Sequence, residues 1–345
     1  MAQIAILGAG GFGISLGVAF SREGHQVTLW SHTPQTVEML VKEREHKKLL
    51  AGILIPEDVV ITGDIACAAH QDIVVVATPS KAVRETCCRI ASLLSKKTVV
   101  VCVSKGLEKD TLKDMCQVME EELTNPVVIL SGPSHAEEVG RGEVTTVVAA
   151  SRSQEAACYV QHTLMSRTLR IYVSDDVVGV ELGGSLKNVI ALAAGICDGL
   201  GLGDNAKAAL MTRGLAEIAR LGVAMGGKQE TFAGLSGIGD LIVTCTSMHS
   251  RNRRAGILVG QGMTGAQAVE QVGMTVEGIG STLAAYQMAK KLGVEMPIVT
   301  QMYQVLFQGK DPREAVQELM GRPGRSETES SWLGREPAEY INVEL

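Results

Sequence analysis

The chain has 345 residues, of which 46% are hydrophobic and 20% are charged, so it is long enough to form two domains with separate cores. Its formal net charge of -6 argues against nucleic acid or an anionic membrane as a partner, because both are bound through clustered positive charge. Aromatic residues make up only 3%, which argues against surfaces that stack on bases or sugars.

The cysteines and the start of the chain indicate the compartment. The eight cysteines form no Cys-x-x-Cys pair, and a strand-like run begins at Gln3, which leaves no room for a secretory leader. We therefore expect a cytoplasmic protein with reduced thiols. The most apolar long stretch, residues 177–196, contains Glu181, Lys187 and Asn188, so it predicts a buried helix and no integral membrane segment.

The first half of the chain alternates short β-branched runs with segments of helical spacing, up to about Ser174. This alternation is typical of parallel βαβ units, and the continuous apolar character of the runs indicates strands buried on both faces. We expect an α/β fold with a doubly wound parallel sheet. Its strands are expected at residues 4–7, 26–30, 72–77, 98–103, 126–130, 145–149 and 169–172.

The second half changes character after Asp175 and Asp176, which can cap the start of a helix. Ala, Leu, Gly and Met then recur at helical spacing, which predicts an all-α domain over residues 177–320. Its helices are expected at residues 177–194, 205–225, 264–271, 278–292, 297–307 and 312–320. Residues 321–345 are rich in Ser, Glu, Gly and Pro without periodicity, which predicts a flexible tail.

A glycine-rich turn follows the first expected strand and precedes a helical segment. It reads Gly8-Ala9-Gly10-Gly11-Phe12-Gly13, which is the spacing and the context of the dinucleotide-binding fingerprint. Gly8 permits a tight turn, Gly10 lets the backbone approach a pyrophosphate at the helix N-terminus, and Gly13 allows close packing of helix on strand. We therefore expect a nucleotide-binding Rossmann domain at residues 1–176, against the alternative of a purely structural glycine turn.

The end of the second strand bears on the choice between NADH and NADPH. An acidic residue there would bind the ribose 2′-hydroxyl and repel a 2′-phosphate, but the chain has Trp30-Ser31-His32-Thr33. Because Ser31 and His32 can donate hydrogen bonds to a phosphate, we expect NADPH to be accepted at least as well as NADH. The alternative is that both are ordinary loop residues.

Two polar loops follow later strands, at the sheet edge where open parallel sheets bind ligands. Lys105 follows the strand at 98–103, although a loop lysine is ordinarily a solvated surface group. Ser131-Gly132-Pro133-Ser134-His135-Ala136 follows the strand at 126–130. Its hydroxyls and free N-H groups could bind a phosphate or a carboxamide.

The strongest signal for chemistry is Lys187, in the middle of a helix-like stretch that otherwise reads as fully buried. A lysine is rarely buried without a partner, because loss of hydration is costly and lowers its pKa. A lysine with a lowered pKa suits a general acid or base near neutral pH, whereas snorkelling or structural pairing is the alternative. Gly183 and Gly184 would let a ligand or another backbone approach the helix closely.

A carboxylate and a basic run complete the candidate site. Asp240 lies alone in a glycine-rich apolar run, so it needs a cationic partner if it is buried, and Lys187 is the candidate. The run Ser250-Arg251-Asn252-Arg253-Arg254 reads by default as a solvated face. Beside a phosphorylated substrate, however, a guanidinium and an amide form a fork for phosphate oxygens.

Taken together, these clusters resemble the bacterial NAD(P)-dependent glycerol-3-phosphate dehydrogenases. The matching motifs are GAGGFG, SKGLEKDT, SGPS, ELGGSLKNVIALAAGICDG and GIGDLIVTCTSMHSRNRR, in that order and up to about Met320. The resemblance implies a Rossmann domain joined to an α-helical domain like that of 6-phosphogluconate dehydrogenase, with the active site in the cleft. It also implies reversible reduction of dihydroxyacetone phosphate by NADPH or NADH for glycerophospholipid synthesis, a homodimer, and no metal.

The resemblance also assigns roles to individual residues. The match to Lys187 is the proton donor and acceptor at the substrate oxygen, and the matches to Asp240 and Thr244 support it. Arg251 and Asn252 match the substrate-phosphate binders. Further substrate contacts are implied for Lys105, Gly132, Ser134, Asn188 and Ser250, and cofactor contacts for Gly8, Gly10, Gly11, Phe12, Gly13, His32, Lys105, Ala136, Arg251 and Glu277.

Two positions depart from the family pattern, and three other functions stay open. His135 stands where an apolar residue is more usual, and we expect no catalytic role for it. Gly11 stands where serine is frequent, which removes one hydroxyl donor to the cofactor phosphate. The alternatives are a dehydrogenase for another hydroxy acid, which would not need the phosphate fork, a nucleotide-sensing protein without turnover, and a scaffold protein.

Overall fold

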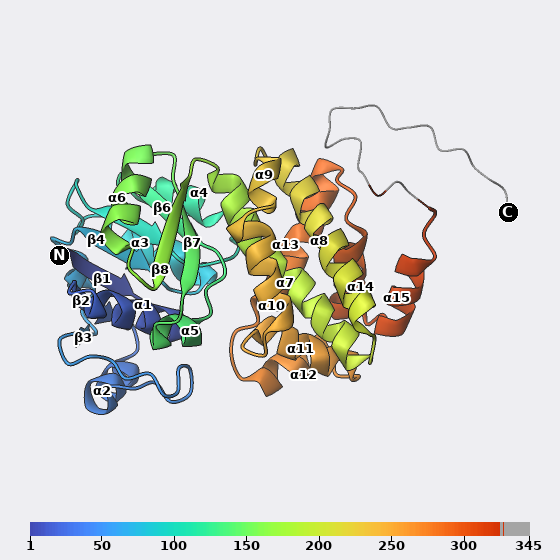
Figure 1. The fold of residues 1–345 in the computed structure, drawn as a ribbon, viewed down its shortest axis with the longest axis horizontal. Helices are drawn as coiled ribbons and strands as arrows, with labels where there is room; N and C mark the ends of the chain where they lie inside the picture. The colour runs from blue at the N-terminus through green and yellow to red at the C-terminus, as the bar shows by residue number, and fades with distance from the viewer. Residues whose placement is uncertain (325–326, 328–345) are drawn as a thin grey trace.

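The structure is a computed structural model that describes residues 1–324 and 327. Most of the tail expected at 321–345 lies outside the described residues. The chain divides into a sheet-containing half and a helical half, which lie side by side in Figure 1. The last strand ends at Ser174 and the first long helix of the second half begins at Val177, close to where the sequence changes character.

The first half contains an eight-stranded, mostly parallel sheet with the strand order β3-β2-β1-β4-β5-β6-β7-β8. Every neighbouring pair is parallel except β6 and β7, which are antiparallel. Strands β4, β5 and β6 are buried along their whole length, as their apolar sequences predict. The strands are β1 Gln3–Leu7, β2 Gln26–Trp30, β3 Val60–Thr62, β4 Ile73–Val76, β5 Val99–Cys102, β6 Val127–Ser131, β7 Thr145–Ala150 and β8 Leu169–Ser174.

Helices cover both faces of this sheet, because alternate strand residues point to opposite sides. Ile4 and Ile6 pack in one core with α1 (Gly11–Arg22), α5 (Ala136–Arg141) and α6 (Gln154–Leu164). Ala5 and Leu7 pack in a second core with α3 (Val83–Ile90) and α4 (Met115–Glu122). Helix α2 (Pro34–Glu43) follows β2 and adds Leu40 to the first core.

The second half is built around α7 (Val177–Gly199), which is buried along nearly all of its length. It is long and apolar enough to span a membrane, but 94% of its most apolar window is buried inside the protein, as in a core helix. Helix α11 (Arg251–Gly260) crosses it in close contact. A Cβ atom on Gly195 would lie 2.1 Å from the carbonyl oxygen of Arg253, so this approach requires glycine.

Most of the remaining helices pack against α7. Three α-helices in the described part of this half are not predicted from the sequence. The unexpected helices are α9 (Gln229–Phe232), α10 (Asp240–Thr246) and α11 (Arg251–Gly260). The expected ones are α8 Asp204–Ala224, α12 Gly265–Val272, α13 Glu277–Leu292, α14 Pro297–Gln308 and α15 Pro312–Met320. Of these, α12 packs against α11 and α15 against α14. The three-residue edge strand β3 and the antiparallel direction of β7 also differ from the expected parallel arrangement.

Candidate active site in the cleft between the two halves

A cleft of about 620 Å³ lies between the two halves and is lined by both. The sheet half contributes the turns that follow β1, β4 and β5, and the N-terminus of α5. The helical half contributes residues of α7 and the N-termini of α11 and α13. The cleft therefore opens at the carboxyl ends of the parallel strands, where folds of this class bind ligands.

The glycine-rich turn at the start of α1 has the shape that a dinucleotide needs. Gly8 has φ +133°, and a Cβ atom there would lie 2.6 Å from the carbonyl oxygen of Ala77. A Cβ atom on Gly13 would lie 1.9 Å from the carbonyl oxygen of Gly8, whereas no described atom lies within 4 Å of one on Gly10. No described side chain caps the N-terminus of α1 after Gly10. Gly10, Gly11, Phe12 and Gly13 line the cleft, and the first N-H groups of a helix have no partner within it, so these residues fit a pyrophosphate.

The segments after β2 and α2 line another part of the cleft. The first contributes Ser31, His32, Thr33 and Thr36, and the second contributes His46, Lys48 and Leu49. None of these residues is acidic, in agreement with the sequence between Trp30 and Thr33. His46 and Lys48 are not among the residues that the sequence predicts, because they follow neither a strand nor a recognisable motif.

Two lysines meet one buried carboxylate in the cleft wall. Lys187 on α7 donates hydrogen bonds to Asp240 Oδ1 and, over 2.9 Å, to Thr244 Oγ1. Lys105 Nζ donates to Asp240 Oδ2 over 2.8 Å and to the carbonyl oxygen of Gly132 over 3.0 Å. Lys187 and Asp240 are only 6% and 1% exposed. The pairing expected between these two residues is therefore confirmed, and Lys105 is a second partner that the sequence does not predict.

The charges in this cluster set its protonation. Burial lowers the pKa of Lys187 from 10.5 to about 8; Asp240 opposes this shift and the positive charge of Lys105 adds to it. Burial alone would raise the pKa of Asp240, but the two ammonium groups hold it below its ordinary value. Lys187 can therefore gain and lose a proton near neutral pH, while Asp240 stays ionised.

A chain of amides connects three helices at the other wall of the cleft. Asn252 Nδ2 on α11 donates to Asn188 Oδ1 on α7 over 2.8 Å, and Asn252 Oδ1 accepts from the backbone N-H of Gly278 over 2.8 Å. Asn188 Nδ2 in turn donates to Glu277 Oε2 on α13 over 3.3 Å. Burial raises the pKa of Glu277, although the positive charge of Arg251 lowers it. One of the two Nδ2 hydrogens of Asn252 is used in the bond to Asn188, so the other is left for a ligand.

Arg251 begins α11, directly after its N-cap. The Ser250 hydroxyl accepts a hydrogen bond from the backbone N-H of Arg253 over 3.2 Å, so Ser250 has a structural partner. The Arg251 side chain is exposed and lines the cleft. A guanidinium at a helix N-terminus forms a site for a phosphate or another anion.

The expected site residues lie together, with two exceptions that stand behind the cleft surface. All of them line the cleft except Gly132 and Asp240, which are hydrogen-bonded to the lysines. Ser134 lines the cleft and donates to the carbonyl oxygen of Gly132 over 3.0 Å. The His135 ring also lines the cleft, and burial together with the charge of Lys187 lowers its pKa, which favours the neutral form.

Thr78 is a cleft residue that the sequence does not single out. Within the described part of the chain its hydroxyl is buried without a hydrogen-bond partner. It follows β4, so the rule that strand ends bind ligands was a usable signal.

Among residues 1–324 and 327, no group of three His, Cys, Asp or Glu side chains is arranged to hold a metal ion.

Comparison with known proteins identifies the family. The model of the NAD-dependent glycerol-3-phosphate dehydrogenase N-terminus matches residues 3–157, and that of the C-terminus matches residues 176–317. Relatives named glycerol-3-phosphate dehydrogenase, NAD(P)+, from Fusobacterium nucleatum and Moorella thermoacetica are each 52% identical to this chain. The alignments cover 96% and 95% of this chain and 100% and 98% of the relatives.

A solved structure agrees with these matches. The crystal structure of glycerol-3-phosphate dehydrogenase from Coxiella burnetii has a TM-score of 0.89 and 39% sequence identity, and covers 93% of this chain and 99% of that one. A ketopantoate reductase from Ralstonia eutropha, with a TM-score of 0.58 and 15% identity, shares the fold; it covers 92% of this chain and 99% of that one. The chain therefore belongs to the NAD-dependent glycerol-3-phosphate dehydrogenase family of NAD(P)-dependent oxidoreductases.

Proposed function

We propose that the protein interconverts dihydroxyacetone phosphate and sn-glycerol 3-phosphate, with Lys187 as the proton donor and acceptor. The observation that carries this proposal is the position of the Lys187 ammonium, which is buried in the wall of the cleft that also contains the glycine-rich turn. The relatives named for this activity support the choice of substrate.

The chemistry divides between the cofactor and the protein. The nicotinamide supplies the hydride for carbonyl reduction and accepts it in the reverse direction. The protein side is a proton transfer, in which protonated Lys187 donates to the substrate oxygen as that oxygen gains negative charge. Asp240 keeps the ammonium charged and directed, and the neighbouring Thr244 hydroxyl accepts a second hydrogen bond from it. The carbonyl gains one hydride and one proton, which gives the alcohol.

The substrate phosphate is assigned to the N-terminus of α11. Arg251 provides a guanidinium there, and Asn252 provides the amide N-H that the chain of amides leaves free. These contacts hold the carbonyl at a fixed distance from Lys187, so their loss should harm turnover as well as affinity. Lys105, Ser134, Asn188 and Ser250 complete the wall around the substrate.

The cofactor assignment follows the cleft from the glycine-rich turn to the segment after β2. Gly8, Gly10, Gly11, Phe12 and Gly13 would hold the pyrophosphate, Ala136 lies beside Gly11, and Glu277 lines the cleft from the helical half. His32 stands where a carboxylate would select NADH, so NADPH is accepted at least as well as NADH. Comparison of kcat/KM for the two cofactors tests this, and a strong preference for NADH would refute it.

The wider role follows from the reaction. We infer that the protein acts in the cytoplasm, where glycerol 3-phosphate supplies the backbone of glycerophospholipids. We also infer that it is a homodimer. Residues 1–176 form the nucleotide-binding domain and residues 177–320 the catalytic domain. Sedimentation velocity of the purified chain tests the dimer, and a single species of monomer mass would contradict it.

The decisive experiment follows the absorbance of the reduced nicotinamide when dihydroxyacetone phosphate is added to the protein with NADH or NADPH. We expect oxidation of the cofactor, and its reduction when sn-glycerol 3-phosphate and NAD(P)+ are supplied. Cofactor binding without any absorbance change would support a nucleotide sensor instead. Turnover only of hydroxy acids without phosphate would support the alternative dehydrogenase.

A further inference from the structure

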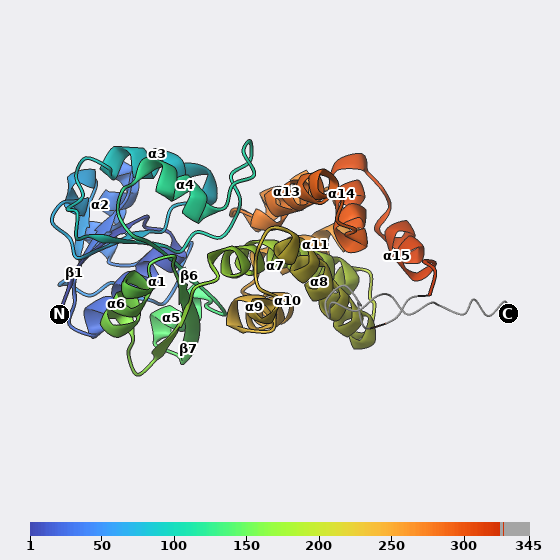
Figure 2. The same cartoon turned by 90° about the horizontal axis from the view of Figure 1, so that it is seen from above.

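The loop between β5 and α4 connects the two halves at the active site. We call residues 103–114 the Lys105 loop. Lys105 at its start binds Asp240 of the helical half, and Leu107 and Leu112 pack against the core of that half. Figure 2 shows this loop projecting from the sheet half at the boundary with the helical half. Its conformation therefore decides where the Lys105 ammonium lies.

The Lys105 loop is folded on itself by a few backbone bonds. The N-H of Glu108 donates to the carbonyl oxygen of Lys113, and the N-H of Leu112 donates to that of Glu108, both over 2.9 Å. Leu112 has φ +58°, a conformation that is costly for a branched side chain. Besides the packing of Leu107 and Leu112 and the ion pair of Lys113 with Glu121, such a loop needs a further contact to hold it in one position.

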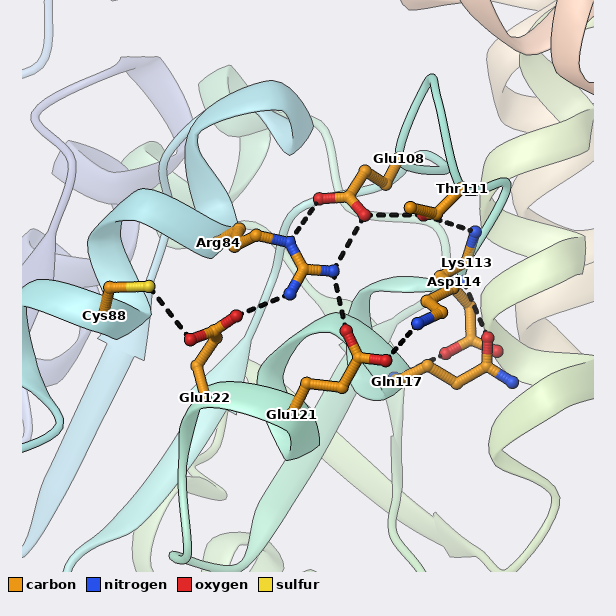
Figure 3. Close-up of polar contacts among 9 residues, drawn as sticks. All are labelled: Arg84, Cys88, Glu108, Thr111, Lys113, Asp114, Gln117, Glu121 and Glu122. Atoms are coloured by element: carbon orange, nitrogen blue, oxygen red, sulfur yellow. Dashed lines mark hydrogen bonds and ion pairs between the residues drawn. The ribbon is translucent and has the colours of Figure 1, made fainter.

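Arg84 on α3 supplies that contact. Its Nε and Nη2 donate to Glu108 Oε1 and Oε2, each over 2.8 Å, in a bidentate arrangement. The same guanidinium binds Glu121 over 2.8 Å and Glu122 over 2.5 Å, both on α4 (Figure 3). The Arg84 and Glu108 side chains are 31% and 20% exposed, so water screens this pair less than an ordinary surface ion pair.

We propose that Arg84 is a positioning residue for the reaction: through Glu108 it holds the Lys105 loop against the active site. This inference rests on the proposed function. Without the guanidinium, Glu108 loses its ionic partner, and the more exposed ion pair of Lys113 with Glu121 is left to hold the loop to α4. The loop would then release Lys105 from Asp240.

Release of Lys105 has a consequence that a purely structural role for Arg84 does not have. Lys187 faces Asp240 and Thr244 from α10, Lys105 from the loop, His135 from the start of α5 and Glu277 from α13. Of these, the positive charge of Lys105 lowers the pKa of Lys187. If Lys105 moves away, Asp240 is paired with Lys187 alone and the pKa of Lys187 rises.

The test compares Arg84→Gln with the wild type in dihydroxyacetone phosphate reduction over a range of pH. We expect kcat/KM to fall by about 10-fold or more, because small displacements in an active site are costly. We also expect the limb of the pH profile that reports Lys187 to move to higher pH. Arg84→Lys should recover only part of the activity, because it keeps the charge but loses the fork.

A second variant serves if Arg84→Gln does not fold, and a measurement of the loop itself does not depend on turnover. Glu108→Gln should give the same two effects, and the double variant should be no worse than either single one, since both break one contact. Hydrogen-deuterium exchange of the peptide that covers the Lys105 loop should be faster in both. Arg152→Gln is the matched control, because it removes the 3.2 Å ion pair to Glu120 on α4 without touching the loop.

The outcomes separate the inference from the function beneath it. Absence of turnover in the wild type would remove the proposed function. Normal wild-type turnover, with folded Glu108→Gln unchanged in kcat/KM, pH profile and loop exchange, would overturn the role of Arg84 alone. Additive losses in the double variant would do the same. If Arg84→Gln fails to fold, Glu108→Gln decides, because it leaves the bonds from Arg84 to α4 in place.

Discussion

Replacement of Lys187 by methionine should separate activity from stability. Methionine has a similar length and fits the buried position without an ammonium group. We expect turnover to fall by about 10²-fold or more, which is the usual contribution of a general acid. Asp240 would keep Lys105 as its partner, so the change leaves no unpaired buried carboxylate.

The stability effect can be worked out from the pKa. The pKa of Lys187 falls from 10.5 to about 8 in the folded chain, which corresponds to about 3 kcal/mol against folding while the lysine is charged. Between these pH values the unfolded chain binds more protons, so wild-type stability rises with pH and the penalty disappears above about 10.5. The Lys187→Met protein should therefore be at least as stable as the wild type at neutral pH, and this difference should shrink in alkaline solution.

Steady-state assays and urea unfolding at several pH values check both halves of this prediction. Lys96→Met, at an exposed loop position, is the matched control and should behave like the wild type. Near-normal turnover in folded Lys187→Met would refute the assignment of the proton donor. A large loss of stability at neutral pH would refute the account of its charge balance.

Three further predictions concern the cofactor turn, the phosphate site and a buried carboxyl. Gly13→Ala places a Cβ 1.9 Å from the Gly8 carbonyl oxygen, so it should cost about 1–3 kcal/mol in urea unfolding and weaken NADH binding measured by fluorescence. Arg251→Leu should lower kcat/KM for dihydroxyacetone phosphate by about 10²-fold but scarcely alter that for dihydroxyacetone, which lacks the phosphate. Burial raises the pKa of Glu217 from 4.5 to about 7, so the folded state holds more protons in that window. Wild-type stability, measured relative to Glu217→Gln, should therefore fall as pH rises from 4.5 to about 7.

Much of the fold could be predicted from the sequence because its signals are local. The apolar runs that become β4, β5 and β6 and the glycine spacing at Gly8 to Gly13 follow directly from the residues. Strand β3 could not be predicted, since three partly exposed residues at a sheet edge carry too little pattern. The direction of β7 depends on how the chain returns after α5, which residue periodicity does not encode.

The candidate site could likewise be predicted from the sequence only in part. A lysine within an apolar helix indicates a partner, and Asp240 is that partner. Helices α10 and α11 could not be predicted, because the glycines before Asp240 and the basic run at Arg251 read as a loop. Gly256 and Gly260 of α11 are required where this helix packs on α7. The contact of Lys105 with Asp240 joins residues 135 positions apart, and only the fold brings them together.

A crystal structure of the protein with NADPH and dihydroxyacetone phosphate would show whether Lys187 reaches the substrate carbonyl. We expect the Lys187 ammonium to lie within hydrogen-bonding distance of the substrate carbonyl oxygen and the substrate phosphate to contact Arg251. A substrate bound in the cleft with its carbonyl turned away from Lys187, or with its phosphate elsewhere, would contradict it.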